Sequence, residues 1–252
     1  MKTESKNNIC IRKEGDIILV LLLAYITRIL FYIKYPVPWR DSMFYYSVMA
    51  EYINQGFYPE TNLWGSLNYL PPVPSFLVYI THLINNGSIV NEAISVEICF
   101  GLVLVYCIWK TVLTAFGSRS IALIVSLIAA VHPLLVEIST QFSRDNFYLA
   151  FISAMLLSIV SNIKNRNILK NLFIGLFLSL AILCRYESFE FFLVYPFVFL
   201  IFVKSIKQCM LHSIAFYFFT ALFSAIMIQI IGCSSFYYYS AFQRIFLYLS
   251  KL

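Results

Sequence analysis

The dominant feature of this sequence is a series of apolar runs that follow one another along most of the chain. There are seven, each 15 residues or longer: Ile17–Tyr35, Ala93–Trp109, Ser120–Ile138, Phe147–Ile163, Leu169–Cys184, Phe189–Val203 and Leu211–Ile231. A helix of about 20 apolar residues crosses a bilayer. Only 12% of the 252 residues are charged, against about 25% in soluble domains. The sequence therefore predicts an all-α polytopic membrane protein and excludes an ordinary soluble globule.

A shorter apolar run, residues 71–84 (PPVPSFLVYITHLI), decides the topology. It begins with prolines and is short for a span, which favours an interfacial segment. If it does not span and the N-terminus is cytoplasmic, eleven Lys and Arg lie inside and six outside; if it spans, the counts are eight and nine. The positive-inside rule favours the first arrangement. We therefore expect one seven-span module over residues 1–252, with a cytoplasmic N-terminus (1–16), a first outer loop (36–92) and an outer C-terminal tail (232–252).

The net charge of +6 does not indicate a nucleic-acid partner, because the basic residues are scattered singly between apolar runs. The six cysteines form no CxxC motif and most lie in apolar stretches, so they predict no zinc cluster. The expected topology gathers charged side chains from three separate loops at one membrane face. These side chains are Arg40 and Asp41, Arg144 and Asp145, and Arg185 and Glu187.

The first outer loop contains two predicted helices. Residues 39–56 (WRDSMFYYSVMAEYINQG) have a helical apolar stripe, with Asp41 or Ser42 as N-cap and Gly56 as the stop. Residues 71–84 form the second, which begins at its prolines. Aromatic residues crowd this loop, and two explanations are open: an interfacial aromatic belt, or walls against a sugar or an isoprenoid.

Asp41 also has two interpretations. Asp is among the best N-cap residues, so it can serve structure alone. A carboxylate at a helix N-terminus is held anionic, which suits a general base or a metal ligand at the mouth of a membrane cavity.

The order of these motifs resembles the GT-C superfamily of glycosyltransferases, including bacterial members related to protein O-mannosyltransferases and aminoarabinose transferases. RDSMFYYSVMAEYINQG followed by YLPPVPSFLVYI is similar to the family's first outer loop. HPLLVEISTQFSRDNFYLAF (132–151) and AILCRYESF (181–189) are similar to downstream motifs. The resemblance covers residues 17–231 and implies the seven-helix module shared by the superfamily.

The resemblance implies an enzyme of the cell envelope, in a bacterial plasma membrane. Such enzymes take a sugar from a polyprenyl-phosphate donor at the extracytoplasmic face and transfer it to a glycan, lipid or protein acceptor. By position, Asp41 is the candidate general base or metal ligand, with Mg²⁺ or Mn²⁺ as the candidate cofactor. Ser42 stands where some members have a second acid, so a metal-binding Asp-Glu pair is in doubt.

The remaining charged residues have both functional and structural interpretations. Arg185, Arg40 and Arg144 are candidates for the donor phosphate, because Arg grips phosphate in a bidentate fork. Asp145 and Glu187 are supporting acids or metal ligands. Alternatively, Arg144 and Asp145 cap a helix, and Arg185 and Glu187 form a local ion pair. The ionisable residues of the apolar runs rank lower: Arg28, which could snorkel or pair with an acid, Glu97, His132 and Glu137.

Two rival functions remain open. One is a small transporter, although seven spans do not divide into two repeats and the charges lie at one face. The other is a truncated, non-catalytic remnant or scaffold, because enzymes of this type continue beyond their seventh helix. A second polypeptide could then supply the C-terminal part.

Overall fold

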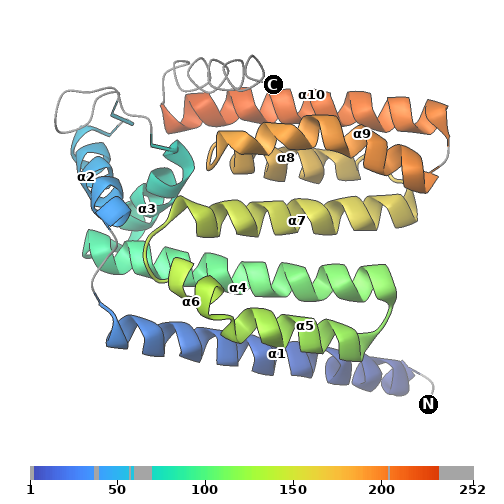
Figure 1. The fold of residues 1–252 in the computed structure, drawn as a ribbon, viewed down its shortest axis with the longest axis horizontal. Helices are drawn as coiled ribbons and strands as arrows, with labels where there is room; N and C mark the ends of the chain where they lie inside the picture. The colour runs from blue at the N-terminus through green and yellow to red at the C-terminus, as the bar shows by residue number, and fades with distance from the viewer. Residues whose placement is uncertain (1–2, 37–39, 57, 60–69, 204, 233–252) are drawn as a thin grey trace.

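In the computed structural model, most helices run side by side as a bundle, and two further helices, α2 (Arg40–Gln55) and α3 (Pro72–Asn85), lie across one end of it (Figure 1). The structure describes residues 3–36, 40–56, 58–59, 70–203 and 205–232, without the side chains of residues 3–14, 40, 41 and 186. Every described element is helical, which confirms the all-α prediction. The elements are α1 (Thr3–Lys34), α2 (Arg40–Gln55), α3 (Pro72–Asn85), α4 (Ile89–Phe116), α5 (Arg119–Val131), α6 (Pro133–Ile138), α7 (Arg144–Asn165), α8 (Lys170–Ile182), the 3-10 turn η1 (Tyr186–Phe189), α9 (Glu190–Val203) and α10 (Ile206–Ile231).

Along the chain, helices α1, α4, α5, α7, α8, α9 and α10 alternate in direction, in line with the seven apolar runs of the sequence (Figure 1). Within the described residues, four helices are long and apolar enough to cross a membrane: Gly15–Lys34 of α1, then α4, α7 and α10. The shorter helices α5, α8 and α9 run beside them in Figure 1. Many large apolar side chains face outwards along these helices, as expected where lipid is the solvent.

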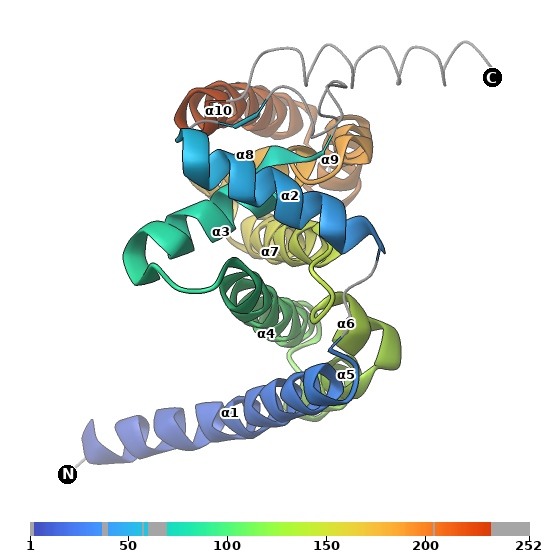
Figure 2. The same ribbon diagram turned by 90° about the vertical axis from the view of Figure 1, so that its left-hand side faces the viewer.

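The two helices predicted in the first outer loop are confirmed as α2 and α3. Figure 2 shows α2 lying across the end of the bundle. Gly56 follows α2 with φ +77°, so it ends the helix as predicted. The predicted N-cap is wrong, because α2 already includes Asp41 and Ser42 in its first turn.

One predicted element is divided in the structure. The run 120–138 was expected to be a single span, but it forms α5 and α6, with His132 between them in an extended conformation. The cause is Pro133, because a proline disfavours helical geometry in the residue before it and starts a helix well. The chain therefore turns before it reaches the loop that leads into α7.

Arg28 is buried completely within the bundle. Its Nη1 donates to the carbonyl oxygens of Ala24 and Ala130, at 2.9 and 3.2 Å. Arg28 therefore does not snorkel, and it pairs with no acid among the described residues, which corrects both expectations. It interacts instead with the C-terminal end of α5, where the helix dipole favours a cation and the last carbonyls lack helical partners.

Gly101 makes room for the Arg28 side chain. A Cβ added at Gly101 would lie 2.6 Å from Arg28 Nε and 2.8 Å from Ser139 Cβ. Small residues commonly permit such close approach between membrane helices. The packing of α1 against α4 therefore depends on the absence of a side chain at this position.

The three loops that carry the candidate residues meet at one end of the bundle. The start of α7, the end of α8 with η1, and the start of α2 all lie at the end that α2 and α3 cover (Figures 1 and 2). The other end of the bundle carries many of the basic residues, among them Lys110, Lys164, Arg166, Lys170 and Lys207. By the positive-inside rule this other end is the cytoplasmic one, and the orientation stays a prediction.

Candidate functional site

The first turn of α7 presents Arg144 and Asp145 to the loop-covered end of the bundle. Ser143 is the N-cap, and its Oγ accepts a hydrogen bond from the Asp145 N–H at 3.1 Å. An acidic side chain in the first turn is also favoured by the helix dipole. The alternative that Arg144 and Asp145 cap a helix is thus correct in that both lie in the first turn of α7, but the capping side chain is that of Ser143.

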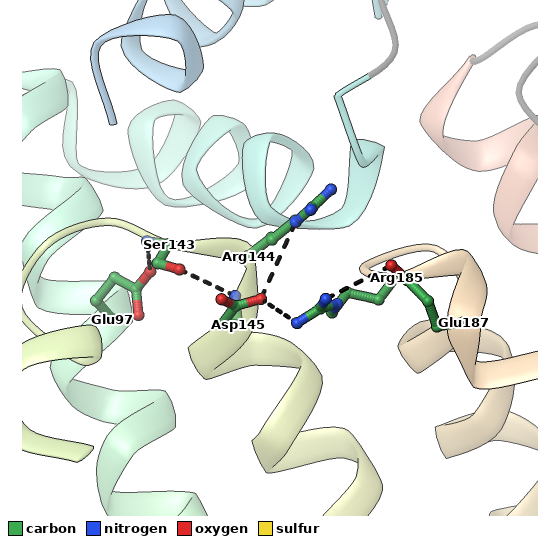
Figure 3. Close-up of polar contacts among 6 residues, drawn as sticks. All are labelled: Glu97, Ser143, Arg144, Asp145, Arg185 and Glu187. Atoms are coloured by element: carbon green, nitrogen blue, oxygen red, sulfur yellow. Dashed lines mark hydrogen bonds and ion pairs between the residues drawn. The ribbon is translucent and has the colours of Figure 1, made fainter. Parts of the chain in front are cut away.

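Asp145 is also joined to the turn that follows α8. Arg185 Nη1 donates to Asp145 Oδ1 at 2.8 Å, and Arg185 Nη2 donates to Glu187 Oε1 at 3.5 Å (Figure 3). The Arg185 guanidinium lies over the Tyr148 ring, 5.5 Å from its centroid. The expected Arg185–Glu187 pair is therefore present, and it extends across the bundle to α7.

The two carboxylates compensate the charge of Arg185. Burial lowers the pKa of Arg185, but Asp145 and Glu187 outweigh this effect and hold the pKa above its usual value. Arg144 is less tightly paired, since its Nε lies 4.0 Å from Asp145 Oδ1 and its side chain is 38% exposed. Arg144 is thus the cation of this cluster that an incoming anion can reach with less competition.

A pocket of about 310 Å³ opens beside this cluster. It is lined by residues of α2, of the loop before α7 and of the first turn of α7, together with Leu70: Phe44, Tyr45, Leu70, Phe142, Ser143, Arg144 and Asp145. Its lining therefore combines aromatic rings with two charged side chains. Arg185 does not line the pocket, but it contacts Asp145, which does.

Ser42 fixes the start of α2 to the same loop. Its buried hydroxyl contacts the carbonyl oxygens of Gln141 and Phe142, at 2.5 and 3.1 Å. A carboxylate at this position would face these oxygens without a proton to donate. Ser42, which stands where some family members have an acid, therefore has a structural role: it joins α2, the helix of Asp41, to the loop before Arg144.

Asp41 and Arg40 are placed only in part. Their backbone belongs to the first turn of α2, next to Ser42, while their side chains lie outside the described portion. The structure therefore brings the backbone of Asp41 to the loop beside the pocket. The roles of both side chains stay predictions.

The aromatic residues of the first outer loop divide into two groups. Phe44 and Tyr45 line the pocket, and Tyr45 packs edge-on against Phe142. Tyr52 and Tyr79 instead stack on each other at 4.3 Å, and the Tyr52 hydroxyl donates to the Ile231 carbonyl. Some rings are thus available to a ligand, while others join α2, α3 and α10. Trp39, Phe57, Trp64 and Tyr69 lie outside the described residues.

The ionisable residues of the apolar runs, Glu97, His132 and Glu137, lie at different places in the fold. Glu97 lies fully buried beneath the start of α7, where it contacts Ser143 and Asn146. His132 is the junction of α5 and α6, and Glu137 belongs to α6. Neither side chain forms an ion pair with the Arg144–Glu187 cluster in the described part of the chain.

The described carboxylates do not by themselves provide a divalent-cation site. Among the described residues, no group of three or more His, Cys, Asp or Glu could hold a metal ion. Asp145 and Glu187 both contact Arg185, whose positive charge opposes a cation at that place. The Mg²⁺ or Mn²⁺ requirement stays a prediction that depends on Asp41.

Sequence reasoning missed three residues that shape this site. Ser143 was readable, because a serine directly before an Arg-Asp pair and an apolar run is a standard helix start. Ser42 was predicted as a possible N-cap and noted for the acid that it replaces, but not for its contact with the loop before α7. Phe142, which is buried with φ +21° under the pocket, carries no local signal of its role.

Comparisons with known proteins show the family of the chain. The sequence profile of the family described as dolichyl-phosphate-mannose-protein mannosyltransferase matches residues 70–231, more than half of the chain. No curated protein matches.

Among solved structures, the chain is similar to the apo crystal structure of the Archaeoglobus fulgidus oligosaccharyltransferase. The TM-score is 0.62 at 14% identity, over 82% of this chain and 29% of that chain. This likeness concerns the fold, and the chain spans less than a third of that protein's length. The profile match shows that the chain belongs to the dolichyl-phosphate-mannose-protein mannosyltransferase family, within the GT-C superfamily of membrane glycosyltransferases.

Proposed function

We propose that this integral membrane protein transfers a sugar from a polyprenyl-phosphate donor to a hydroxyl group of a glycan, lipid or protein acceptor. The observation that carries the proposal is the pocket between α2 and the start of α7. It combines an aromatic wall with Arg144 and Asp145, and Ser42 ties its loop to the helix turn that contains Asp41. The family match gives independent support to sugar transfer.

The chemistry needs a base and a cation. The acceptor hydroxyl gives its proton to a carboxylate while its oxygen forms the new bond to the anomeric carbon. The bond between that carbon and the donor phosphate oxygen breaks, and the electron pair leaves with the phosphate. Asp41 is the proposed base, and a nearby cation stabilises the charge on the leaving phosphate.

Arg144 is the preferred cation for the phosphate. It lines the pocket and is partly exposed, whereas Arg185 is engaged by Asp145 and Glu187. Arg185 then acts through Asp145, whose side chain it holds at the pocket wall. Arg40 is a further candidate from the sequence alone.

The pocket size favours a single sugar. Small-molecule sites span about 300–1,000 Å³, and this pocket, at about 310 Å³, lies at the lower end of that range. Aromatic faces such as Phe44 and Tyr45 provide apolar surface against which a sugar ring packs. The proposed donor therefore carries one sugar residue.

The proposed orientation places this pocket outside the cytoplasm. The opposite end of the bundle carries the Lys and Arg residues that the positive-inside rule assigns to the cytoplasm. A polyprenyl-phosphate sugar in the outer leaflet would then reach the pocket from the membrane.

Purified protein in liposomes tests the proposal directly. With a radiolabelled polyprenyl-phosphate sugar and a mixture of envelope acceptors, the wild type is expected to produce labelled acceptor. The same sugar on a nucleotide is expected to be inert. Product formation from the nucleotide donor alone would contradict the proposed donor class.

Arg144→Gln refines the test. Loss of the pocket cation is expected to raise the donor KM about tenfold, since about 1.4 kcal/mol corresponds to that factor. Arg166→Gln is the matched control, because Arg166 is exposed and follows α7 at its other end. A donor KM that is equal in both variants would remove Arg144 from the donor site.

A further inference from the structure

We infer that Glu97 is a positioning residue of the transferase site: a buried carboxylate on α4 that fixes the first turn of α7, and with it Arg144 and Asp145. The inference rests on the proposed function for its kinetic consequence. Its geometric part stands on contacts of Glu97 with Ser143 and Asn146 in the described structure, and Figure 3 shows the contact with Ser143.

Both carboxylate oxygens of Glu97 are used by the start of α7. Oε1 accepts the backbone N–H of Ser143 at 2.6 Å, and Oε2 accepts the side-chain amide of Asn146. The same Asn146 amide donates to the Glu97 carbonyl at 2.8 Å. These contacts come from residues on both sides of Arg144 and Asp145, so they fix the segment between them.

The electrostatics of a helix start support the arrangement. The first N–H groups of a helix have no intrahelical partner, and the helix dipole makes this end positive. The Ser143 hydroxyl caps α7 from within the chain, while Glu97 supplies an acceptor from a neighbouring helix. A fully buried carboxylate is costly unless it is hydrogen-bonded, and here α7 provides the donors.

The position of Glu97 separates it from the reacting groups. It is 0% exposed and does not line the pocket, while Ser143, Arg144 and Asp145 do. A direct role as base or phosphate ligand therefore does not follow from its geometry. Its effect reaches the pocket through Ser143, whose backbone it holds and whose hydroxyl orients the N–H of Asp145.

Removal of this carboxylate would loosen one particular part of the site. Without the Glu97 side chain, the Ser143 N–H loses its buried acceptor, and the Asn146 amide keeps only the backbone carbonyl of residue 97. The first turn of α7 can then shift, which alters how Asp145 meets Arg185 and where Arg144 points. We therefore expect a lower kcat/KM for the donor and an unchanged KM for the acceptor.

Three variants test the inference in liposomes. Glu97→Ala removes both acceptors and is expected to lower kcat/KM for the donor at least tenfold, with the acceptor KM within twofold. Glu97→Gln keeps an acceptor oxygen for the Ser143 N–H but turns an amide donor toward the Asn146 amide, so its loss of donor kcat/KM is expected to be smaller than that of Glu97→Ala. Asn146→Ala removes one half of the contact and remains informative if Glu97→Ala does not fold.

Glu92→Ala is the matched control. Glu92 is also a buried carboxylate of α4, but it accepts from the Gly87 N–H and pairs with His82 at 2.8 Å, away from α7. This variant is expected to lower thermal stability with little change in donor kcat/KM. Equal losses of donor kcat/KM in Glu92→Ala and Glu97→Ala, at matched stability loss, would reduce Glu97 to a general structural role and overturn the inference.

Amide hydrogen exchange gives a readout that needs no activity. Exchange in the peptide that covers residues 141–147 is expected to rise at least tenfold in Glu97→Ala, to rise less in Glu97→Gln, and to stay at the wild-type rate in Glu92→Ala. Unchanged exchange in Glu97→Ala overturns the inference. If the wild type transfers no sugar, the proposed function fails, and exchange alone then decides whether Glu97 positions α7.

Discussion

Arg185 and Asp145, 40 residues apart in the sequence, meet through a hydrogen bond of 2.8 Å between Nη1 and Oδ1. This contact joins the turn after α8 to the first turn of α7 at the wall of the pocket. Because Arg185 does not line the pocket, the pair makes Asp145 the residue through which Arg185 acts.

A double-mutant cycle measures this relationship. Asp145→Asn and Arg185→Gln are each expected to lower donor kcat/KM by about tenfold, which corresponds to about 1.4 kcal/mol. The double variant is expected to resemble the poorer single variant, because residues in contact are not additive. A hundredfold loss in the double variant would mean that the two residues act independently.

The sequence predicted the helices of this fold better than the contacts of its site. Apolar runs and their flanking charges indicated the bundle, α2 and α3, because burial in lipid imposes such patterns. His132-Pro133 carried a readable break that the apolar composition of residues 120–138 hid. Ser42 and Glu97 could not be interpreted from sequence, because their partners lie in a loop distant along the chain.

The hydroxyl of Ser42 is expected to stabilise the junction between α2 and the loop before α7. Ser42→Ala leaves the Gln141 and Phe142 carbonyls without this donor, at a cost of about 1–3 kcal/mol in unfolding free energy. Thermal unfolding in detergent micelles measures the effect. Ser47→Ala is the control on the same helix, because the Ser47 hydroxyl donates back to the Phe44 carbonyl within α2. A loss no larger than in this control would show that the Ser42 contact contributes nothing.

Gly101 is expected to tolerate no side chain. Gly101→Ala forces a methyl group against Arg28 Nε and Ser139 Cβ, and overpacking of this kind costs about 1–3 kcal/mol. The melting temperature of the purified protein should fall. At Gly15 of α1 an added Cβ meets nothing within 4 Å, so Gly15→Ala should be neutral or stabilising. An unchanged melting temperature in Gly101→Ala would contradict the packing of α1 against α4.

Opposite ends of the bundle are expected to face opposite sides of the membrane. In a cysteine-free background, Ser88→Cys and Lys164→Cys place thiols before α4 and in the last turn of α7. A membrane-impermeant thiol reagent added to intact cells should label position 88 and leave position 164 unlabelled until the membrane is opened. The reverse pattern would invert the proposed orientation. Labelling of both positions would contradict the three crossings by α4, α5 and α7 that separate them.

The central claim is a transferase site in which Asp41 of α2 removes the acceptor proton. The most direct measurement compares turnover of wild type, Asp41→Asn and Glu51→Gln in liposomes at saturating donor. Glu51 is a carboxylate of the same helix that bonds to Gln55, so it controls for a change of charge on α2. We expect Asp41→Asn to lower turnover at least about 100-fold, as loss of a general base does, with Glu51→Gln near wild type. Wild-type turnover in Asp41→Asn would contradict the account.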